Sequence, residues 1–208
     1  MSESSQHPKA GWFLNRLARL LFWLSGWRTE GGVPPIPRFV VIAAPHTSYW
    51  DAIIMLTAGC HFDVKFSWMV KDAAFFFPLG ILTRYFGGIP IDRKKRSNVV
   101  GQAIDWLRKS HSLFLAVSPE GTRSRADHWK TGFYHIAMGA EVPIVFGYID
   151  YKRKVAGLGP VFEPTGDIEA DFREFARFYD NVTPKYPELR GRVALRPGGE
   201  EEKRRAVG

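Results

Sequence analysis

Short apolar runs alternate with amphipathic stretches along most of the chain. Five runs have the length and the β-branched or aromatic content of buried strands: residues 39–43, 64–70, 113–117, 142–150 and 155–162. Four stretches repeat apolar residues at the spacing of a helix face: residues 50–60, 98–109, 131–139 and 168–179. This alternation predicts an α/β fold, a single domain with a largely central β-sheet flanked by helices.

The two ends of the chain differ in composition from its middle. Residues 1–10 are polar, and residues 197–208 are rich in Gly, Glu, Lys and Arg, so we expect both segments to be disordered. The predicted domain covers residues 36–196 and shows no internal repeat. Residues 11–28 precede it as a separate helix.

The N-terminal helix carries three tryptophans and three arginines within residues 11–28. A helix that spans a bilayer needs about 20 largely apolar residues, whereas Asn15, Arg16 and Arg19 interrupt this one. Indole rings and arginines together are typical of the membrane interface. We therefore predict an interfacial helix at the membrane surface. The alternative is a core helix of the domain.

Charge and cysteine content narrow the classes of partner. The net charge of +8 and the pI near 9.7 predict anionic partners. The sequence has no RNP-type motif, zinc-finger spacing or helix-turn-helix signal, so we expect an anionic membrane surface and no nucleic acid. Cys60 is the single cysteine, which excludes an intramolecular disulfide framework and suits a reducing compartment. We expect no metal and no cofactor, and a peripheral or monotopic location at the cytoplasmic face of the membrane.

A histidine and an aspartate lie five positions apart directly after the first apolar run. Open α/β sheets place their chemistry at the carboxyl ends of strands, and the segment 44–51, APHTSYWD, reads as a strand end followed by a helix start. His46 could act there as a general base, with Asp51 fixing its tautomer and stabilising the imidazolium. The alternative is that Asp51 only caps the helix.

Two further polar segments follow predicted turns and strands. Residues 118–125, SPEGTRSR, combine a glycine, which permits close approach to a ligand, with arginines and hydroxyls that donate to phosphate. Residues 87–96 place a turn and a short strand before four consecutive cations. Each segment alone could be a solvated surface loop. Their occurrence together with the histidine segment favours a site for an anionic ligand.

These segments resemble the sequence blocks of the glycerolipid acyltransferases, the 1-acylglycerol-3-phosphate acyltransferase superfamily. The blocks stand in the family's order: H-x4-D at 46–51, a second block at 88–93, P-E-G-T-R-S at 119–124, and an apolar strand with proline at 142–145. The resemblance covers roughly residues 39–150. Pro45 departs from the pattern, because many members carry Asn at that position.

The resemblance implies an enzyme that transfers an acyl group from acyl-CoA or acyl carrier protein to the hydroxyl of a lysophospholipid, most often 1-acylglycerol-3-phosphate. His46 would be the general base and Asp51 its partner. The positions that match the family's acceptor-phosphate contacts are Arg93, Glu120, Gly121, Thr122, Arg123 and Ser124. A carboxylate repels phosphate, so we expect Glu120 to hold an arginine or to bond to a glycerol hydroxyl.

An acyl pocket is the second expected feature of the site. The stretch 73–86 holds too many aromatic residues for a solvent-exposed face, so it is either core or a wall for a fatty chain. We expect Phe76 and Phe77 from this stretch, and Pro143 from the fourth block, to line the pocket.

Other functions compete with this prediction. A Ser-His-Asp hydrolase would need a G-x-S-x-G elbow, which the sequence lacks. A non-catalytic binder of anionic lipid would be expected to lose His46 or Asp51, yet both are present. Acyltransferases for other lysolipids, such as lyso-ornithine lipids, share the same blocks, so the acceptor headgroup stays open.

Overall fold

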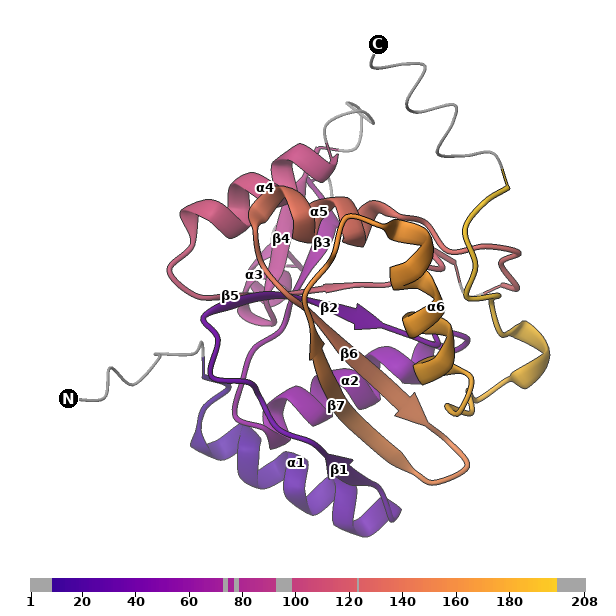
Figure 1. Cartoon of the computed structure of the whole chain (residues 1–208). Helices are drawn as coiled ribbons and strands as arrows, with labels where there is room; N and C mark the ends of the chain where they lie inside the picture. The colour runs from indigo at the N-terminus through magenta and orange to yellow at the C-terminus, as the bar shows by residue number, and fades with distance from the viewer. Residues whose placement is uncertain (1–8, 73–74, 77–78, 93–98, 123, 198–208) are drawn as a thin grey trace.

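A seven-stranded mixed sheet forms the centre of the molecule, with helices on both faces (Figure 1). The structure is a computed structural model that describes residues 9–72, 75–76, 79–92, 99–122 and 124–197. The α/β fold predicted from the sequence, with an N-terminal helix in front of it, is confirmed.

The strands are β1 (Arg28–Glu30), β2 (Arg38–Ala43), β3 (Ser67–Lys71), β4 (Gly88–Ile91), β5 (Leu113–Val117), β6 (Ile144–Asp150) and β7 (Val155–Phe162). The helices are α1 (Trp12–Ser25), α2 (Tyr49–His61), α3 (Leu79–Tyr85), α4 (Val99–Lys109), α5 (Gly132–Ala140) and α6 (Ile168–Tyr179), with a 3-10 turn η3 (Pro187–Leu189).

The order of the strands brings three strand ends together. The sheet runs β1-β7-β6-β2-β5-β3-β4, and all neighbours are parallel except β6 and β7, which form an antiparallel hairpin. β2 lies in the centre and pairs with β5 on one side and β6 on the other. Because these three strands are parallel, the loops that follow Ala43, Val117 and Asp150 leave the same edge of the sheet.

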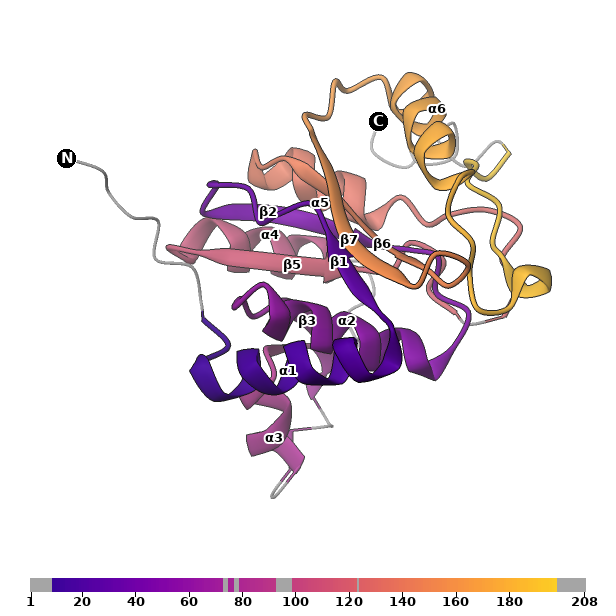
Figure 2. The same cartoon turned by 90° about the horizontal axis from the view of Figure 1, so that it is seen from below.

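The two faces of the sheet are covered by different helices (Figure 2). Alternate residues of β2 point to opposite faces, so Val40 and Ile42 pack against α4, α5 and α6 in the larger core, whereas Phe39 and Val41 belong to the opposite face. That opposite face is covered by α2, and α1 packs in turn against α2.

The sequence pattern predicted most helices and strands to within a few residues of their observed bounds. It did not predict β1, because this three-residue strand, Arg-Thr-Glu, has no alternation of apolar residues. β1 is the outermost strand of the sheet and pairs with β7. The predicted strand over residues 64–70 begins only at Ser67. Within the aromatic-rich stretch 73–86, the helix α3 is shorter than the stretch itself, and its Ile81 is exposed.

The N-terminal helix α1 is attached to the domain by both apolar and polar contacts. Ala18 and Phe22 are its buried residues. The Asn15 side-chain amide donates to the carbonyl oxygens of Cys60 and His61 at 2.9 and 2.8 Å, which satisfies acceptors that the end of α2 would otherwise leave open. The polar residue that interrupts the apolar pattern of α1 is therefore a capping group for α2.

Among the helices in the described part of the chain, none is long and apolar enough to cross a bilayer.

Candidate active site

His46 and Asp51 lie at the junction between β2 and α2. The chain leaves β2 after Ala43, passes through the cis peptide bond between Ala44 and Pro45, and enters α2 at once. Both side chains are thereby placed at the carboxyl end of the central strand, where the sequence pattern predicted them.

A capping box fixes the start of α2. The Trp50 N–H donates to Oγ of Ser48 at 3.1 Å, and the Ser48 N–H donates back to the carboxylate of Asp51 at 2.8 Å. Asp51 is therefore a helix-capping group, as one interpretation of the sequence held. The same carboxylate also faces the histidine.

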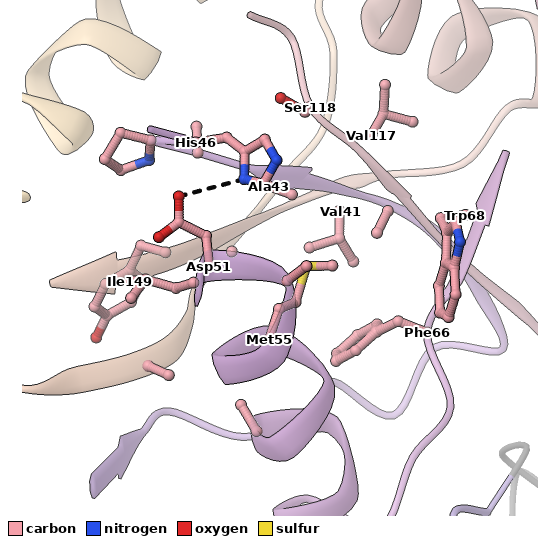
Figure 3. Close-up of a pocket in the computed structure, with 18 of the residues that line it drawn as sticks. Val41, Ala43, His46, Asp51, Met55, Phe66, Trp68, Val117, Ser118 and Ile149 are labelled. Carbon is pink, nitrogen blue, oxygen red and sulfur yellow. Dashed lines mark ion pairs between the residues drawn. The ribbon is translucent and has the colours of Figure 1, made fainter. Parts of the chain in front are cut away.

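The histidine and the aspartate form a close pair (Figure 3). Nδ1 of His46 lies 3.4 Å from Oδ2 of Asp51. Catalytic hydrogen bonds are often this long before substrate binds. With Nδ1 turned to the carboxylate, Nε2 is the ring nitrogen left to accept a proton from a substrate.

Asp51 is buried, only 3% exposed, yet it is held as an anion. Oδ2 accepts the N–H groups of Thr47 and Ser48, each at 2.8 Å, and Oδ1 accepts the hydroxyl of Tyr151 at 2.6 Å. Burial alone would raise the pKa of Asp51, but the hydrogen bonds from His46, Tyr151 and the two amides outweigh it. They hold the pKa below the ordinary value of 3.8.

Glu120 forms a hydrogen bond with the backbone of His46. It is 4% exposed, and its Oε2 accepts the backbone N–H of His46 at 2.6 Å. Burial raises the pKa of Glu120, although the bonds from the backbone of His46 and of Gly191 oppose this. The sequence suggested contacts with Arg93 or Arg123, which lie outside the described residues.

A large cavity opens beside the pair, between the sheet and α2. Its volume is about 750 Å³, in the range typical of small-molecule sites. His46 and Asp51 line one part of it (Figure 3). Apolar side chains from β2, β3, β5, β6, β7 and α2, together with Phe66 just before β3, form most of the remaining wall. Val41, Met55, Phe66, Trp68, Val117 and Ile149 are among them (Figure 3).

The segment after β5 contributes the polar part of the lining. Ser118, Gly121 and Thr122 all line the cavity. The Ser118 hydroxyl is buried and has no hydrogen-bond partner within the described ranges, so it is a donor available to a ligand. Gly121 has a left-handed φ of 63°, and an added Cβ would lie 2.5 Å from Nζ of Lys130, so this ammonium group packs directly on the glycine.

The remaining predicted site residues are distributed differently. The Ser124 N–H donates to Oγ1 of Thr122 at 3.1 Å in an exposed turn. Phe77, like Arg93 and Arg123, lies outside the described residues.

The two other residues expected in the acyl pocket do not line the cavity. Phe76 is 61% exposed. Pro143 comes just before β6 and so lies at the amino end of that strand, at the opposite edge of the sheet from the histidine.

Sequence reasoning missed three residues of the site: Tyr151, Lys130 and Gly191. Tyr151 directly follows β6, so its position after a central apolar run was a usable signal. Lys130 and Gly191 reach the site through loop packing, and no local pattern marks them.

In the described ranges, no group of three or more His, Cys, Asp or Glu side chains is arranged to hold a metal ion. The described site brings together an imidazole, a carboxylate and an adjacent apolar cavity.

Comparisons with known proteins bear on the family and on the fold of the chain. The model of the family described as Acyltransferase matches residues 32–148, more than half of the chain. No curated protein sequence matches. The crystal structure of the 1-acyl-sn-glycerophosphate (LPA) acyltransferase, PlsC, from Thermotoga maritima is similar, with a TM-score of 0.55 and 19% sequence identity. The match covers 78% of this chain and 73% of that chain, and at this identity it shows a shared fold.

Proposed function

Because the chain belongs to the Acyltransferase family, we propose that it transfers a fatty acyl group from acyl-CoA or acyl carrier protein to the hydroxyl of a lysophospholipid. 1-Acylglycerol-3-phosphate is the first acceptor to test. The observation that carries the proposal is the pair of His46 and Asp51 at an apolar cavity of about 750 Å³. A base and a site for a fatty chain are the two parts that this reaction requires.

The reaction needs no nucleophile from the protein. Nε2 of His46 removes the proton of the acceptor hydroxyl, and the oxygen attacks the carbonyl carbon of the thioester. The tetrahedral intermediate then collapses, the carbon–sulfur bond breaks, and the leaving thiolate takes the proton from the imidazolium. Asp51 stays ionised throughout and stabilises the imidazolium. A general base of this kind typically contributes about a hundred- to ten-thousandfold to the rate.

The cavity holds the acyl chain of one substrate. Transfer of a methylene group from water to an apolar wall is favourable by about 0.8 kcal/mol, so a long chain gains considerable affinity there. Met55, Phe66 and Trp68 provide walls of the required kind.

The phosphate of the acceptor binds at the polar end of the cavity. Gly121 and Thr122 line it there, and the Lys130 ammonium packs against Gly121. Arg93 and Arg123 complete the phosphate site in this proposal, because a guanidinium donates two parallel hydrogen bonds to a phosphate.

The enzyme works on an anionic membrane surface at the cytoplasmic face. Support comes from the outer side of α1, where seven apolar side chains are exposed: Trp12, Phe13, Leu17, Leu20, Leu21, Trp23 and Leu24. Tyr49, Trp50 and Ile53 of the neighbouring helix α2 are exposed as well. Exposed apolar side chains on a helix that also carries arginines suit the headgroup region of a bilayer.

A panel of purified substrates tests the proposal. Lysophosphatidate, other lysophospholipids and a lyso-ornithine lipid would be offered with acyl-CoA or acyl carrier protein, and the products identified by mass spectrometry. We expect a diacyl product with lysophosphatidate, and none with the His46→Ala variant. Release of free fatty acid alone, or equal product from the variant, would overturn the assignment.

A further inference from the structure

Tyr151 lies in contact with the proposed catalytic pair, although it is far from the pair in sequence. Its hydroxyl donates to Oδ1 of Asp51 at 2.6 Å, across 100 residues. The Tyr151 N–H donates to the carbonyl oxygen of Thr183 at 2.8 Å, which fixes the backbone directly after β6. Burial raises the pKa of Tyr151, so the phenol stays protonated and acts as the donor.

The two oxygens of Asp51 have unequal sets of partners. Oδ2 faces the N–H groups of Thr47 and Ser48 and also Nδ1 of His46. Oδ1 receives the Tyr151 hydroxyl. A buried carboxylate oxygen that loses its donor is costly. Without the phenol, the carboxylate would be held through Oδ2 alone, and its plane would be less firmly fixed relative to the histidine.

An aromatic contact holds the Tyr151 ring from the side of the N-terminal helix. Trp27 meets it edge-on, with the ring centroids 5.2 Å apart and the planes at 90°. Trp27 follows directly on α1, and its N–H donates to the carbonyl oxygen of Phe22 at 2.9 Å. A continuous chain of contacts therefore leads from α1 through Trp27 and Tyr151 to Asp51.

We propose that Tyr151, supported by Trp27, is a positioning residue that fixes the carboxylate of Asp51 for proton transfer at His46. The inference rests on the proposed function of the pair as base and partner. It extends the proposed active site to the N-terminal segment, which the sequence predicted to be an interfacial helix or, alternatively, a core helix of the domain.

The ionisable groups around Asp51 all remain when the hydroxyl is lost. His46 and Glu120 face Asp51, and Tyr186 lies near Tyr151. Tyr151→Phe changes none of these groups. It removes only the donor to Oδ1, so the orientation of the Asp51 carboxylate toward Nδ1 of His46 becomes less well defined.

The chain offers a matched control for this substitution. Tyr134 is a buried tyrosine whose hydroxyl likewise donates to a buried aspartate, at 2.8 Å to Oδ2 of Asp171, whereas Tyr151 is partly buried. Burial raises its pKa to about 12. Tyr134 joins α5 to α6 and does not line the cavity, so Tyr134→Phe removes a comparable bond away from the pair.

The test compares Tyr151→Phe with Tyr134→Phe in steady-state kinetics across pH. For Tyr151→Phe we expect kcat to fall about tenfold, the size expected when a charge-assisted hydrogen bond is lost. We also expect unchanged KM values for donor and acceptor. Tyr134→Phe should lower only the melting temperature. If both variants keep the wild-type kcat, Tyr151 is merely structural and the proposal fails.

A direct measurement on the His46 ring separates this inference from the proposed reaction. The chain has 6 histidines, so the nitrogen-15 signals of His46 would be assigned by their loss in His46→Gln. These signals report which ring nitrogen carries the proton, and the form protonated at Nδ1 should lose population in Tyr151→Phe even if no tested lysolipid is a substrate. Unchanged His46 signals would overturn the positioning role, whereas absence of product from wild type would count against the proposed function alone.

Trp27→Leu provides a second variant if Tyr151→Phe does not fold. This variant keeps the Tyr151 hydroxyl and removes only the aromatic contact that supports its ring, so we expect a smaller fall in kcat. In the double variant the two effects should be less than additive, because both act through one contact. Full additivity, or a Trp27→Leu enzyme with wild-type kinetics, would remove Trp27 from the proposal.

Discussion

The carboxylate of Glu120 accepts the backbone N–H of His46 at 2.6 Å, across 74 residues of sequence. The P-E-G-T-R-S segment is thus tied to the histidine segment by a buried hydrogen bond. Gly191 closes the other side, because an added Cβ there would lie 3.1 Å from Oε1 of Glu120. Three distant segments therefore meet at one carboxylate, and its removal should affect both stability and turnover.

Glu120→Gln tests this arrangement through the pH dependence of stability. Burial raises the folded-state pKa of Glu120 above 4.5, so its contribution is fully present below that value and is lost as pH rises through the raised pKa. Glutamine does not titrate, so the free energy of unfolding should fall less between pH 4.5 and the raised pKa. Urea unfolding at several pH values measures the slope. Identical slopes for the two proteins would contradict the prediction.

His46→Ala should abolish acyl transfer while leaving the fold and lipid binding intact. His46 is partly exposed and its imidazole fills no core position, so its loss opens little buried space. The rate should fall about a hundred- to ten-thousandfold, the usual contribution of a general base. Single-turnover kinetics and liposome sedimentation provide the two measurements. A variant with the wild-type single-turnover rate would show that another group is the base.

Asp51→Asn should damage both stability and activity, whereas Ser48→Ala should damage stability alone. Each removes part of the cap of α2, with a typical cost of about 1 kcal/mol. Only the asparagine, however, replaces the anion that faces His46.

The same pair of variants should differ in acid. The folded-state pKa of Asp51 lies below 3.8, so its stabilising contribution is present above that pH and is lost as pH falls through the folded pKa. Urea unfolding should show this loss in wild type and in Ser48→Ala but not in Asp51→Asn. Full activity in Asp51→Asn would mean that the carboxylate acts only as a cap.

Met55→Trp should shorten the acyl chain that the enzyme prefers. Met55 lines the cavity from α2, and a larger side chain there reduces the apolar space. We expect kcat/KM for a long-chain donor to fall at least about tenfold relative to a medium-chain donor, since each methylene excluded from an apolar pocket costs about 1–3 kcal/mol. Met138→Trp, at an exposed position on α5, is the control. An unchanged chain-length preference would place the acyl chain elsewhere.

Glutamate at both Trp12 and Trp23 should weaken binding to anionic liposomes. These side chains are 73% and 75% exposed on α1, and a carboxylate at either position is repelled by anionic lipid. Substitution is a cleaner test than deletion of residues 1–28, which would also remove the Asn15 cap and part of β1. Trp106→Glu, exposed on α4, is the matched control. Equal sedimentation of all three proteins would assign α1 a purely structural role.

The fold was predictable because each central strand is a continuous apolar run and each helix repeats its apolar residues at helical spacing. The position of His46 and Asp51 followed from the same logic, since both directly follow the run 39–43. What could not be predicted depends on contacts between distant segments. The role of Glu120 is set by the backbone of His46, and that of Asn15 by the end of α2. No local pattern records either contact.

The central place of β2 also has a consequence for how the protein is made. β2 is synthesised early, but its neighbours β5 and β6, the phenol of Tyr151 and the backbone of Gly191 all come much later in the chain. Non-local pairing of this kind makes folding slow. During translation, the histidine and aspartate leave the ribosome long before the groups that hold them. We therefore expect a nascent chain to stay inactive until nearly its whole length has emerged, and then to gain activity in a single late step.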